Sequence, residues 1–398
     1  MSVKNRIKSN FEILQSLQCF NGKTFSDRYI LFIAFFMLGF GNSLLYVPLF
    51  GLYYLVNRPS LRTINIQKDY VIFSVLIILF VFFLFAIGAN RMTMEMHWRT
   101  FFVILFSLVA AGFALHYQSY NTKLWVLGFY ILGIYFYCLS IVIYSFMVEP
   151  LTSGYGRLLS PFSGKELNSP AITNLLSICF AFFYYIMLYR KSRALQLFSM
   201  IAVLLSIMAG IFLGGRAFFI IVALTIVFFM VAKFNIQSMF RTGMLSGLLI
   251  LAVWIDFHTC KPLLRHYKLL QNRFLEGFTT MGDRFVLYKQ GLEKLPQYPF
   301  GGFHIESHTW IHNLWLDTAR VAGWLPLCFF FLAMLYMLKP FMSIRKAPDF
   351  AFLLFIFLAT LLIMAQDVVF EGEHRVFMVF YFSAVVMLTS CDRDASPC

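Results

Sequence analysis

The sequence contains few charged residues, and this scarcity limits the classes of protein to which it can belong. Lys, Arg, Asp and Glu make up 13% of the 398 residues, while hydrophobic residues make up 60%. An average soluble domain carries about 25% charged and roughly 45–50% apolar residues. The composition therefore excludes a soluble globular domain, and its hydrophobicity also excludes a disordered chain. We expect an integral membrane protein.

Acidic residues are the scarcer of the two charged classes, with 18 Asp and Glu against 32 Lys and Arg, a formal net charge of +14. In a soluble protein such an excess favours nucleic-acid binding. Here the Lys and Arg residues stand in short clusters between apolar runs, which is the usual position of residues that set membrane topology. We therefore expect no nucleic-acid partner.

Cysteine motifs are lacking as well. The seven cysteines form no Cys-x-x-Cys pair and show no metal-ligand spacing, and most of them stand within or beside apolar runs. Buried cysteines of this kind act as small hydrophobic packing residues. The sequence thus predicts neither a disulfide-stapled scaffold nor a cysteine metal site.

Long apolar runs dominate the rest of the chain, and a run of about 20 residues is long enough for a membrane-spanning helix. The first run, Tyr29 to Val56, is interrupted by Gly39, Gly41 and Asn42. We interpret it as two short helices in a tight hairpin, with one long tilted helix as the alternative. With the hairpin counted as two, the prediction is an all-α, polytopic membrane protein of about 12 transmembrane helices in a single domain, 1–398. The other expected spans are 70–90, 99–119, 124–147, 171–189, 194–214, 216–234, 242–257, 322–339, 349–366 and 374–390.

Basic clusters in the short loops predict the orientation of these helices. With the N-terminus inside, the alternation of 12 spans places every compact basic cluster, and also the C-terminus, on the cytoplasmic side. Counting 29–57 as one helix breaks this agreement, which favours the hairpin. The first 28 residues are polar and have no short apolar core, so no signal peptide is expected. The basic clusters are Lys4 to Arg28, Arg58 to Lys68, Arg190 to Arg193, Lys233 with Arg241, and Lys339 to Lys346.

The opposite, periplasmic face receives the longer connections, 148–170, 258–321 and 367–373. The segment 258–321, between the ninth and tenth spans, carries charges of both signs and several aromatic residues. Loops of this length are usually functional. The runs Lys268–Phe278 and Phe285–Leu295 have helical periodicity, so we expect amphipathic helices that cover the membrane face.

Ionisable residues are almost absent from the centres of the predicted spans, and His116, near one span end, is the closest case. Buried ionisable groups mark ion and proton pathways, so their scarcity argues against a transporter. The unusual charges collect instead at the outward ends of the spans. A purely structural membrane protein has no reason to gather Arg and His on one face.

Two outward arginines are candidates for anion binding. Arg216 follows Gly214-Gly215 between two apolar runs. It is either a snorkelling arginine or an anion clamp, because its guanidinium offers a rigid fork of donors to phosphate. Arg284 opens a helical stretch and either pairs with a neighbour such as Asp283 on a solvated face or contacts a ligand.

His312 is a candidate general base or a structural residue. Histidine titrates near neutral pH and can activate a hydroxyl, and Asn313 and Asp317 follow His312 closely, with Asp317 one helical turn after Asn313. The spacing of His304, His308 and His312 also permits part of a zinc site on a continuous helix, but no fourth ligand is obvious, and we expect no metal. Other outward residues that could join a site or be interfacial charges are Arg157, Lys165, Asp367, Glu371, Glu373, His374 and Arg375.

Four short motifs occur in order in the outward segments. They are Arg157 to Pro170 (RLLSPFSGKELNSP), Gly214-Gly215-Arg216, Asp283-Arg284 with Pro299-Phe-Gly-Gly302 downstream, and His312-Asn313 followed after nine residues by Gly323. With these motifs the chain, from about residue 150 onward, resembles the O-antigen ligase/polymerase family of bacterial polytopic membrane glycosyltransferases. The last motif is similar to the His-Asn…Gly signature of the ligases.

This resemblance implies an enzyme that transfers a glycan from undecaprenyl pyrophosphate to a sugar hydroxyl on the periplasmic face of the bacterial inner membrane. It implies inversion at the anomeric carbon without a metal or cofactor. By position, Arg216 and Arg284 would bind the donor pyrophosphate and His312 would be the general base. The supporting residues would be Asn313, Asp317, Gly215, Gly323 and Arg157.

Two acceptors are open within this family. Lipid A-core would make the protein an O-antigen ligase of lipopolysaccharide biosynthesis, and a second carrier-linked glycan would make it a polymerase. The His-Asn…Gly motif favours the ligase. Pro326 stands where the ligases usually carry Gly, Thr or Tyr, so the polymerase is the alternative. A transporter for lipid-linked sugars, such as a flippase, is a weaker hypothesis.

Overall fold

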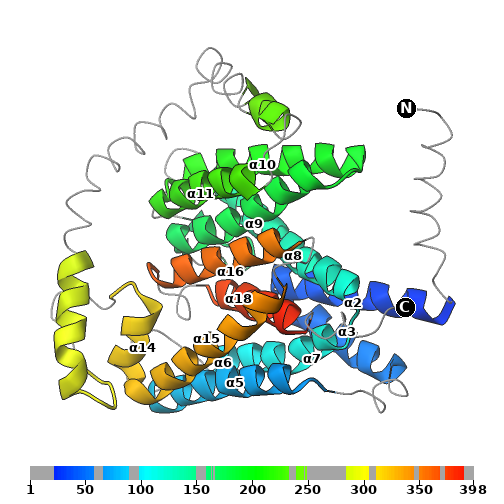
Figure 1. Cartoon of the computed structure of the whole chain (residues 1–398). Helices are drawn as coiled ribbons and strands as arrows, with labels where there is room; N and C mark the ends of the chain where they lie inside the picture. Colours follow the sequence, from blue (N-terminus) through cyan, green and yellow to red (C-terminus); the bar gives the residue numbers. More distant parts are fainter. Residues whose placement is uncertain are drawn as a thin grey trace, which may run out of the picture.

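The computed structural model describes residues 22–57, 66–88, 98–148, 158–162, 164, 166–232, 239–245, 247–248, 284–303, 311–344, 349–367 and 373–389. These residues are mostly helical, as predicted, and the helices lie side by side (Figure 1). Within these ranges the strands form one short antiparallel pair, β1 (Leu158–Leu159) with β2 (Glu166–Leu167).

The first two helices form the predicted hairpin. α2 (Gly22–Phe40) ends in a turn at Gly41 and Asn42, and α3 (Ser43–Val56) packs against α2. Gly41 has a φ of +85°, a left-handed value that glycine adopts without steric cost. The alternative of one long tilted helix is therefore wrong.

α5 (Lys68–Gly88) and α8 (Tyr120–Val148) are continuous helices, whereas the span between them contains a π-helical turn. That span consists of α6 (Trp98–Phe106), η1 (Ser107–Ala111) and α7 (Gly112–His116). A π turn disrupts the regular ladder of helix hydrogen bonds, and here the Tyr381 hydroxyl donates to the Leu108 carbonyl at 3.0 Å. Such pairing matters where no water can reach the backbone.

α9 (Ser169–Tyr189), α10 (Arg193–Leu213) and α11 (Arg216–Ala232) follow one another, and α9 packs against both of the others. Residues 239–245 and 247–248 are also helical. Most of the span predicted at 242–257 lies outside the described residues.

A helix over residues 284–294 continues into the 3-10 turn η2 (Leu295–Gln297). The helical periodicity of Phe285–Leu295 is therefore confirmed, while the helix predicted at Lys268–Phe278 lies outside the described residues.

The C-terminal part contains α14 (Leu314–Ala322), α15 (Trp324–Ile344), α16 (Phe350–Met364) and α18 (Arg375–Leu388). The span predicted at 322–339 begins two residues later than expected, because Gly323 separates α14 from α15. α14 is thus a short helix of its own, placed before the long apolar helix.

The core of the bundle is apolar and aromatic, and every residue of α18 is buried within it. α2 and α8 touch through their backbones. A Cβ at Gly39 would lie 2.1 Å from the Tyr130 carbonyl oxygen, and a Cβ at Gly133 would lie 2.1 Å from the Phe36 carbonyl oxygen. Small residues that let helix backbones meet are typical of packing inside membranes.

The apolar helices are compatible with an integral membrane protein. Four described helices, α5, α8, α9 and α10, have at least 18 residues and are apolar enough to cross a bilayer; shorter apolar helices have 10–17 residues. Large apolar side chains point outward, among them Leu44, 84% exposed, and Val231, 77% exposed. A bilayer would cover these side chains. The total of about 12 spans stays a prediction.

Side-chain contacts group the helix ends into two sets. At one end, the Asn174 amide donates to the Asp367 carboxylate, and the Arg375 guanidinium packs against Gly41. We call this the loop end, because α14 and the helix 284–294 lie there, on the left of Figure 1.

At the opposite end, which we call the Arg190 end, Lys123 donates to the Thr389 hydroxyl and the Tyr185 hydroxyl donates to the Asp349 carboxylate. The alternation predicted from the sequence puts each of these pairs on the cytoplasmic side and the loop end on the periplasmic side. The contacts are consistent with that grouping, while the orientation in a membrane stays a prediction.

Candidate functional site

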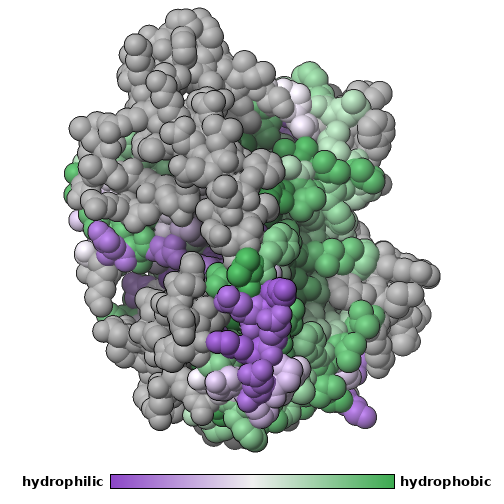
Figure 2. Space-filling model, turned by 90° about the vertical axis from the view of Figure 1, so that its left-hand side faces the viewer, coloured by the Kyte–Doolittle hydropathy of each residue, from purple (hydrophilic) through white to green (hydrophobic). Residues whose placement is uncertain are grey.

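The loop end, seen face-on in Figure 2, carries a strip of hydrophilic residues beside hydrophobic ones. On the helix 284–294, Lys289 and Glu293 pair at 3.9 Å with side chains that are 77% and 63% exposed. The other side of this helix buries Leu287 against Ile311. The outward side of the helix therefore carries the charged pair, together with the exposed apolar side chains of Phe285, Val286 and Leu292.

The carboxylate of Asp317 holds the backbone on both sides of His312. It accepts the N–H of Ile311 at 3.0 Å and the N–H of Asn313 at 3.1 Å. The Nε of Arg320 donates to the same carboxylate at 3.4 Å, and both side chains are buried. Burial raises the pKa of Asp317, while the donors around it oppose that rise. Asp317 thus fixes the backbone of residues 311–313 through hydrogen bonds on both sides of His312.

His312 itself has an unusual backbone. Its φ of +59° makes it the one non-glycine residue with a positive φ in the part of the chain that the structure describes. Such a conformation costs a non-glycine residue of order 1–3 kcal/mol, and residues held in this way cluster at functional sites. The hydrogen bonds from the N–H groups of Ile311 and Asn313 to Asp317 hold His312 in this conformation. The His312 side chain is partly exposed at the loop end.

Asn313 caps α14 and also ties it to α16. The side-chain oxygen of Asn313 accepts the N–H of Trp315 at 3.0 Å and the N–H of Leu316 at 3.1 Å, the usual arrangement at a helix start. The side-chain nitrogen donates to the Ala365 carbonyl at 2.8 Å. Because both ends of one amide are used, the start of α14 is held against the end of α16.

Arg284 and Tyr288 reach the same place from the helix 284–294. Ala365 and Gln366 form the turn that follows α16, and the Arg284 guanidinium donates to the Gln366 carbonyl at 3.2 Å. The Tyr288 hydroxyl lies 3.4 Å from the carbonyl oxygens of Ala365 and His312. The turn 365–366 therefore joins Arg284 to the backbone of His312.

Arg216 lies at the loop end as the first residue of α11. Gly215, before it, packs on α9, where a Cβ at Gly215 would lie 2.3 Å from the Thr173 hydroxyl oxygen. The next residue of α9, Asn174, is 2% exposed and donates to Asp367, directly after the turn 365–366. Gly215 and Asp367 thus both contact the start of α9, which puts the first residue of α11 at the same end of the bundle as the turn 365–366.

Gly323 and the Pro299–Gly302 segment, which belong to separate sequence motifs, form one structural unit. Gly323 has a φ of +78°, and a Cβ there would lie 2.0 Å from the Pro299 carbonyl oxygen. The N–H of Trp324 donates to that carbonyl at 2.9 Å, and the N–H of Gly302 donates to the Arg320 carbonyl at 2.6 Å. These bonds pin the end of α14, and with it the orientation of His312 at its start.

Some of the outward candidates lie elsewhere. Glu373 and Arg375 pair at 2.6 Å, and the Arg375 guanidinium lies 3.8 Å from the centre of the Tyr137 ring. With His374, they form a second buried cluster beside the α2–α3 turn, whereas Asp367 joins the turn 365–366. Arg157, Lys165, Glu371, His304 and His308 lie outside the described residues.

The zinc alternative is therefore untested, since two of its three histidines cannot be placed. Among the described residues, no group of three His, Cys, Asp or Glu side chains could hold a metal ion. The N–H of Ile311, next to His312, donates to Asp317. The Tyr288 hydroxyl donates to the carbonyl oxygen of His312.

Tyr288 and Asn174 are site residues that the sequence analysis missed. Tyr288 stands one helical turn after Arg284 on a predicted helix, so the spacing places both on one side of that helix. Asn174 is an amide near the start of an otherwise apolar span, and buried amides in spans usually have a partner. Both signals are present in the sequence, but neither of them predicts that these side chains lie near the turn 365–366.

Comparison of the chain with protein-family models, with curated proteins and with solved structures finds no match. The fold defines a class: a mostly helical protein with apolar helices that can span a membrane. Its chemistry must be inferred from the loop end.

Proposed function

We propose that the chain is a glycosyltransferase of the bacterial inner membrane, with about 12 spans, cytoplasmic termini and a periplasmic loop end. It transfers a glycan from undecaprenyl pyrophosphate to a sugar hydroxyl. The observation that carries this proposal is the turn 365–366, to which Arg284 donates and against which Asn313 holds the His312 segment. Arginine forks for a pyrophosphate and an imidazole for a hydroxyl are the groups that this reaction needs.

In the proposed reaction His312 accepts the proton of the acceptor hydroxyl while the hydroxyl oxygen attacks the anomeric carbon. The bond from that carbon to the pyrophosphate oxygen breaks, and its electron pair leaves with undecaprenyl pyrophosphate. Attack from the opposite face inverts the anomeric configuration. Arg216 and Arg284 bind the two phosphates and stabilise the charge that develops on the leaving oxygen. No metal or cofactor takes part.

The supporting residues hold His312 and Arg216 in position and do not contact the reacting atoms. Asp317 and Asn313 hold the backbone on each side of His312. Gly215 lets the chain before Arg216 approach α9, and Gly323 lets the Pro299 carbonyl reach the end of α14. Catalytic groups must be held within fractions of an ångström by such neighbours. Arg157 is included in this set by its motif alone.

We infer lipid A-core as the acceptor, which makes the protein an O-antigen ligase. The His-Asn…Gly motif supports this choice through its resemblance to the ligase signature, and its asparagine and glycine stand at the two ends of α14. Pro326 lies in the first turn of α15, where a proline loses no helical hydrogen bond, so it leaves the turn at Gly323 intact. Because Pro326 departs from the ligase pattern, polymerisation of a carrier-linked glycan is the second candidate.

The test is transfer by the purified full chain in nanodiscs, with undecaprenyl-pyrophosphate glycan as donor and lipid A-core as acceptor. We expect transfer to lipid A-core that survives EDTA. Elongation of the donor without lipid A-core identifies the polymerase instead. Loss of transfer in EDTA contradicts the metal-free mechanism, and absence of any transfer by folded protein contradicts the glycosyltransferase.

A further inference from the structure

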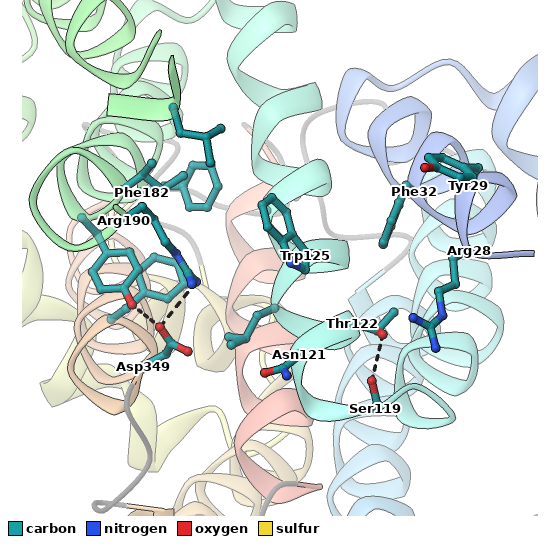
Figure 3. A pocket seen from close by; sticks show the side chains of 16 residues that line it. Arg28, Tyr29, Phe32, Ser119, Asn121, Thr122, Trp125, Phe182, Arg190 and Asp349 are labelled. Atoms are coloured by element: carbon teal, nitrogen blue, oxygen red, sulfur yellow. Dashed lines mark hydrogen bonds and ion pairs between the residues drawn. The ribbon is translucent and has the colours of Figure 1, made fainter. Parts of the chain in front are cut away.

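A cavity with both polar and apolar lining residues lies at the Arg190 end, the end of the bundle opposite the proposed catalytic site. It has a volume of about 690 Å³, within the roughly 300–1,000 Å³ range of small-molecule sites. Arg28 on α2 and Arg190 after α9 lie on opposite sides of it, and Asn121, Thr122 and Trp125 of α8 lie between them (Figure 3).

The cavity is polar at the helix ends and apolar deeper in the bundle. On α2, Phe32 follows Arg28 by four residues, and on α9, Phe182 precedes Arg190 by eight. At 1.5 Å per helical residue these rings lie about 6 and 12 Å further along their helices than the arginines. Trp125, 49% exposed, lines the same cavity. A ligand that fits must therefore be charged at one end and apolar at the other.

The charges select an anion for the polar end. Two guanidinium groups, those of Arg28 and Arg190, and one carboxylate, that of Asp349, line the cavity, with Asp349 on the Arg190 side (Figure 3). Asp349 already accepts the Tyr185 hydroxyl and lies 3.5 Å from Nη2 of Arg190. A guanidinium has five donors in a planar fork that matches phosphate, so one such pair leaves Arg190 with donors for a second anion.

We propose that this cavity binds an anionic phospholipid, with its headgroup at the end lined by Arg28 and Arg190 and its acyl chain against Phe32, Trp125 and Phe182. Tryptophan and tyrosine mark the headgroup level of a membrane, and both Trp125 and Tyr29 line the cavity beside the arginines. Basic pockets between membrane helices on the cytoplasmic side are suited to anionic headgroups. The inference concerns the end opposite the proposed active site and holds whichever glycan the enzyme transfers.

The test is native mass spectrometry of the purified full chain, titrated with phosphatidylglycerol or with phosphatidylcholine as the zwitterionic probe. We expect phosphatidylglycerol to bind at least tenfold more tightly than phosphatidylcholine. Arg28→Gln should remove most of this preference, and Arg28→Lys, which keeps the charge but not the fork, should remove part of it. Arg193→Gln is the matched control, since it removes a charge from the same end outside the cavity.

Equal binding of both lipids, or equal loss in Arg28→Gln and Arg193→Gln, overturns the proposal. Displacement of phosphatidylglycerol by an equimolar amount of inorganic phosphate also overturns it, because the acyl chain would then add nothing to binding and the ligand would be a free anion. Circular dichroism of each variant establishes that a loss of binding does not come from unfolding.

Discussion

Residues at the loop end divide into two groups. The first is proposed to contact the substrates, and the second holds the residues of the first group in position. Arg284 belongs to the first group, and its hydrogen bond to the Gln366 carbonyl uses only one of its five donors. Asp317 belongs to the second group, because the residue is only 7% exposed and its carboxylate accepts the N–H groups of Ile311 and Asn313. Variants of the two groups should therefore differ in what they lose, activity in the first and stability in the second.

Arg284→Gln should reduce glycan transfer by about 10²–10³-fold, the usual effect of losing one well-placed charge donor. The melting temperature should change little, because the variant keeps a donor near the Gln366 carbonyl. Lys289→Gln is the control on the same helix, where the exposed Lys289 side chain has only a weak surface partner. Initial rates in nanodiscs measure both, and equal rates for the two variants would contradict a role for Arg284 in donor binding.

Sequence reasoning identified single residues at the loop end but not their partners. Motif order pointed to Arg216, Arg284 and His312, and helical spacing was enough to add Tyr288. The turn 365–366 was not predictable, because its contribution is two backbone carbonyls, which any residue type provides. The left-handed backbone of His312 also escaped notice, since only the surrounding hydrogen bonds impose it on a histidine.

At the scale of elements, the contact of Gly323 with the Pro299 carbonyl fixes the C-terminal end of α14, and through this helix it helps to orient His312 before the N-terminal end. Gly323→Ala should lower the stability of the loop end by roughly 1–3 kcal/mol, because alanine is strained at positive φ. Its Cβ would also overlap the Pro299 carbonyl. The melting temperature and the transfer rate should fall together.

Gly51→Ala is the matched control for this substitution. Gly51 lies inside α3, and a Cβ there meets nothing within 4 Å. Alanine should therefore be neutral or should stabilise the helix by up to about 1 kcal/mol. If both alanine variants melt at the wild-type temperature, the backbone contact at Gly323 does not hold α14.

Element boundaries were predictable where the chain carries a local signal. Gly41 and Asn42 marked the hairpin turn, and apolar periodicity marked the helix 284–294. The π turn Ser107–Ala111 and the break between α14 and α15 were not predicted. The π turn is stabilised by Tyr381, which stands far away in the sequence, and Gly323 resembles any other glycine near a span.

At the scale of the whole molecule, the two ends of the bundle should face opposite sides of the membrane. Cysteine placed at the exposed Lys289 should react with a membrane-impermeant maleimide in intact spheroplasts. Cysteine placed at Lys191, which is exposed at the Arg190 end, should react only after permeabilisation. The unsubstituted chain, with its seven native cysteines, gives the background. The reverse pattern would place the proposed active site in the cytoplasm and contradict a periplasmic reaction.

Apolar, membrane-compatible helices were predictable from composition, and sidedness stays a prediction from the basic clusters, whereas the packing order of the helices was not predictable. The contact of α2 with α8 depends on Gly39 and Gly133 facing each other's backbone. A Cβ added at Gly51, another glycine inside a described helix, meets nothing within 4 Å, so the pairing could not be read from the residue type. Helix neighbours in membranes depend on surface shape more than on hydrophobic pattern.

The most direct measurement is the transfer rate of His312→Asn beside the wild-type chain. Asparagine adopts the left-handed backbone readily, so this variant keeps the turn and removes the base. We predict an unchanged melting temperature and a transfer rate lower by about 10²–10⁴-fold, the usual contribution of a general base. Wild-type transfer by folded His312→Asn protein would contradict a catalytic role for His312.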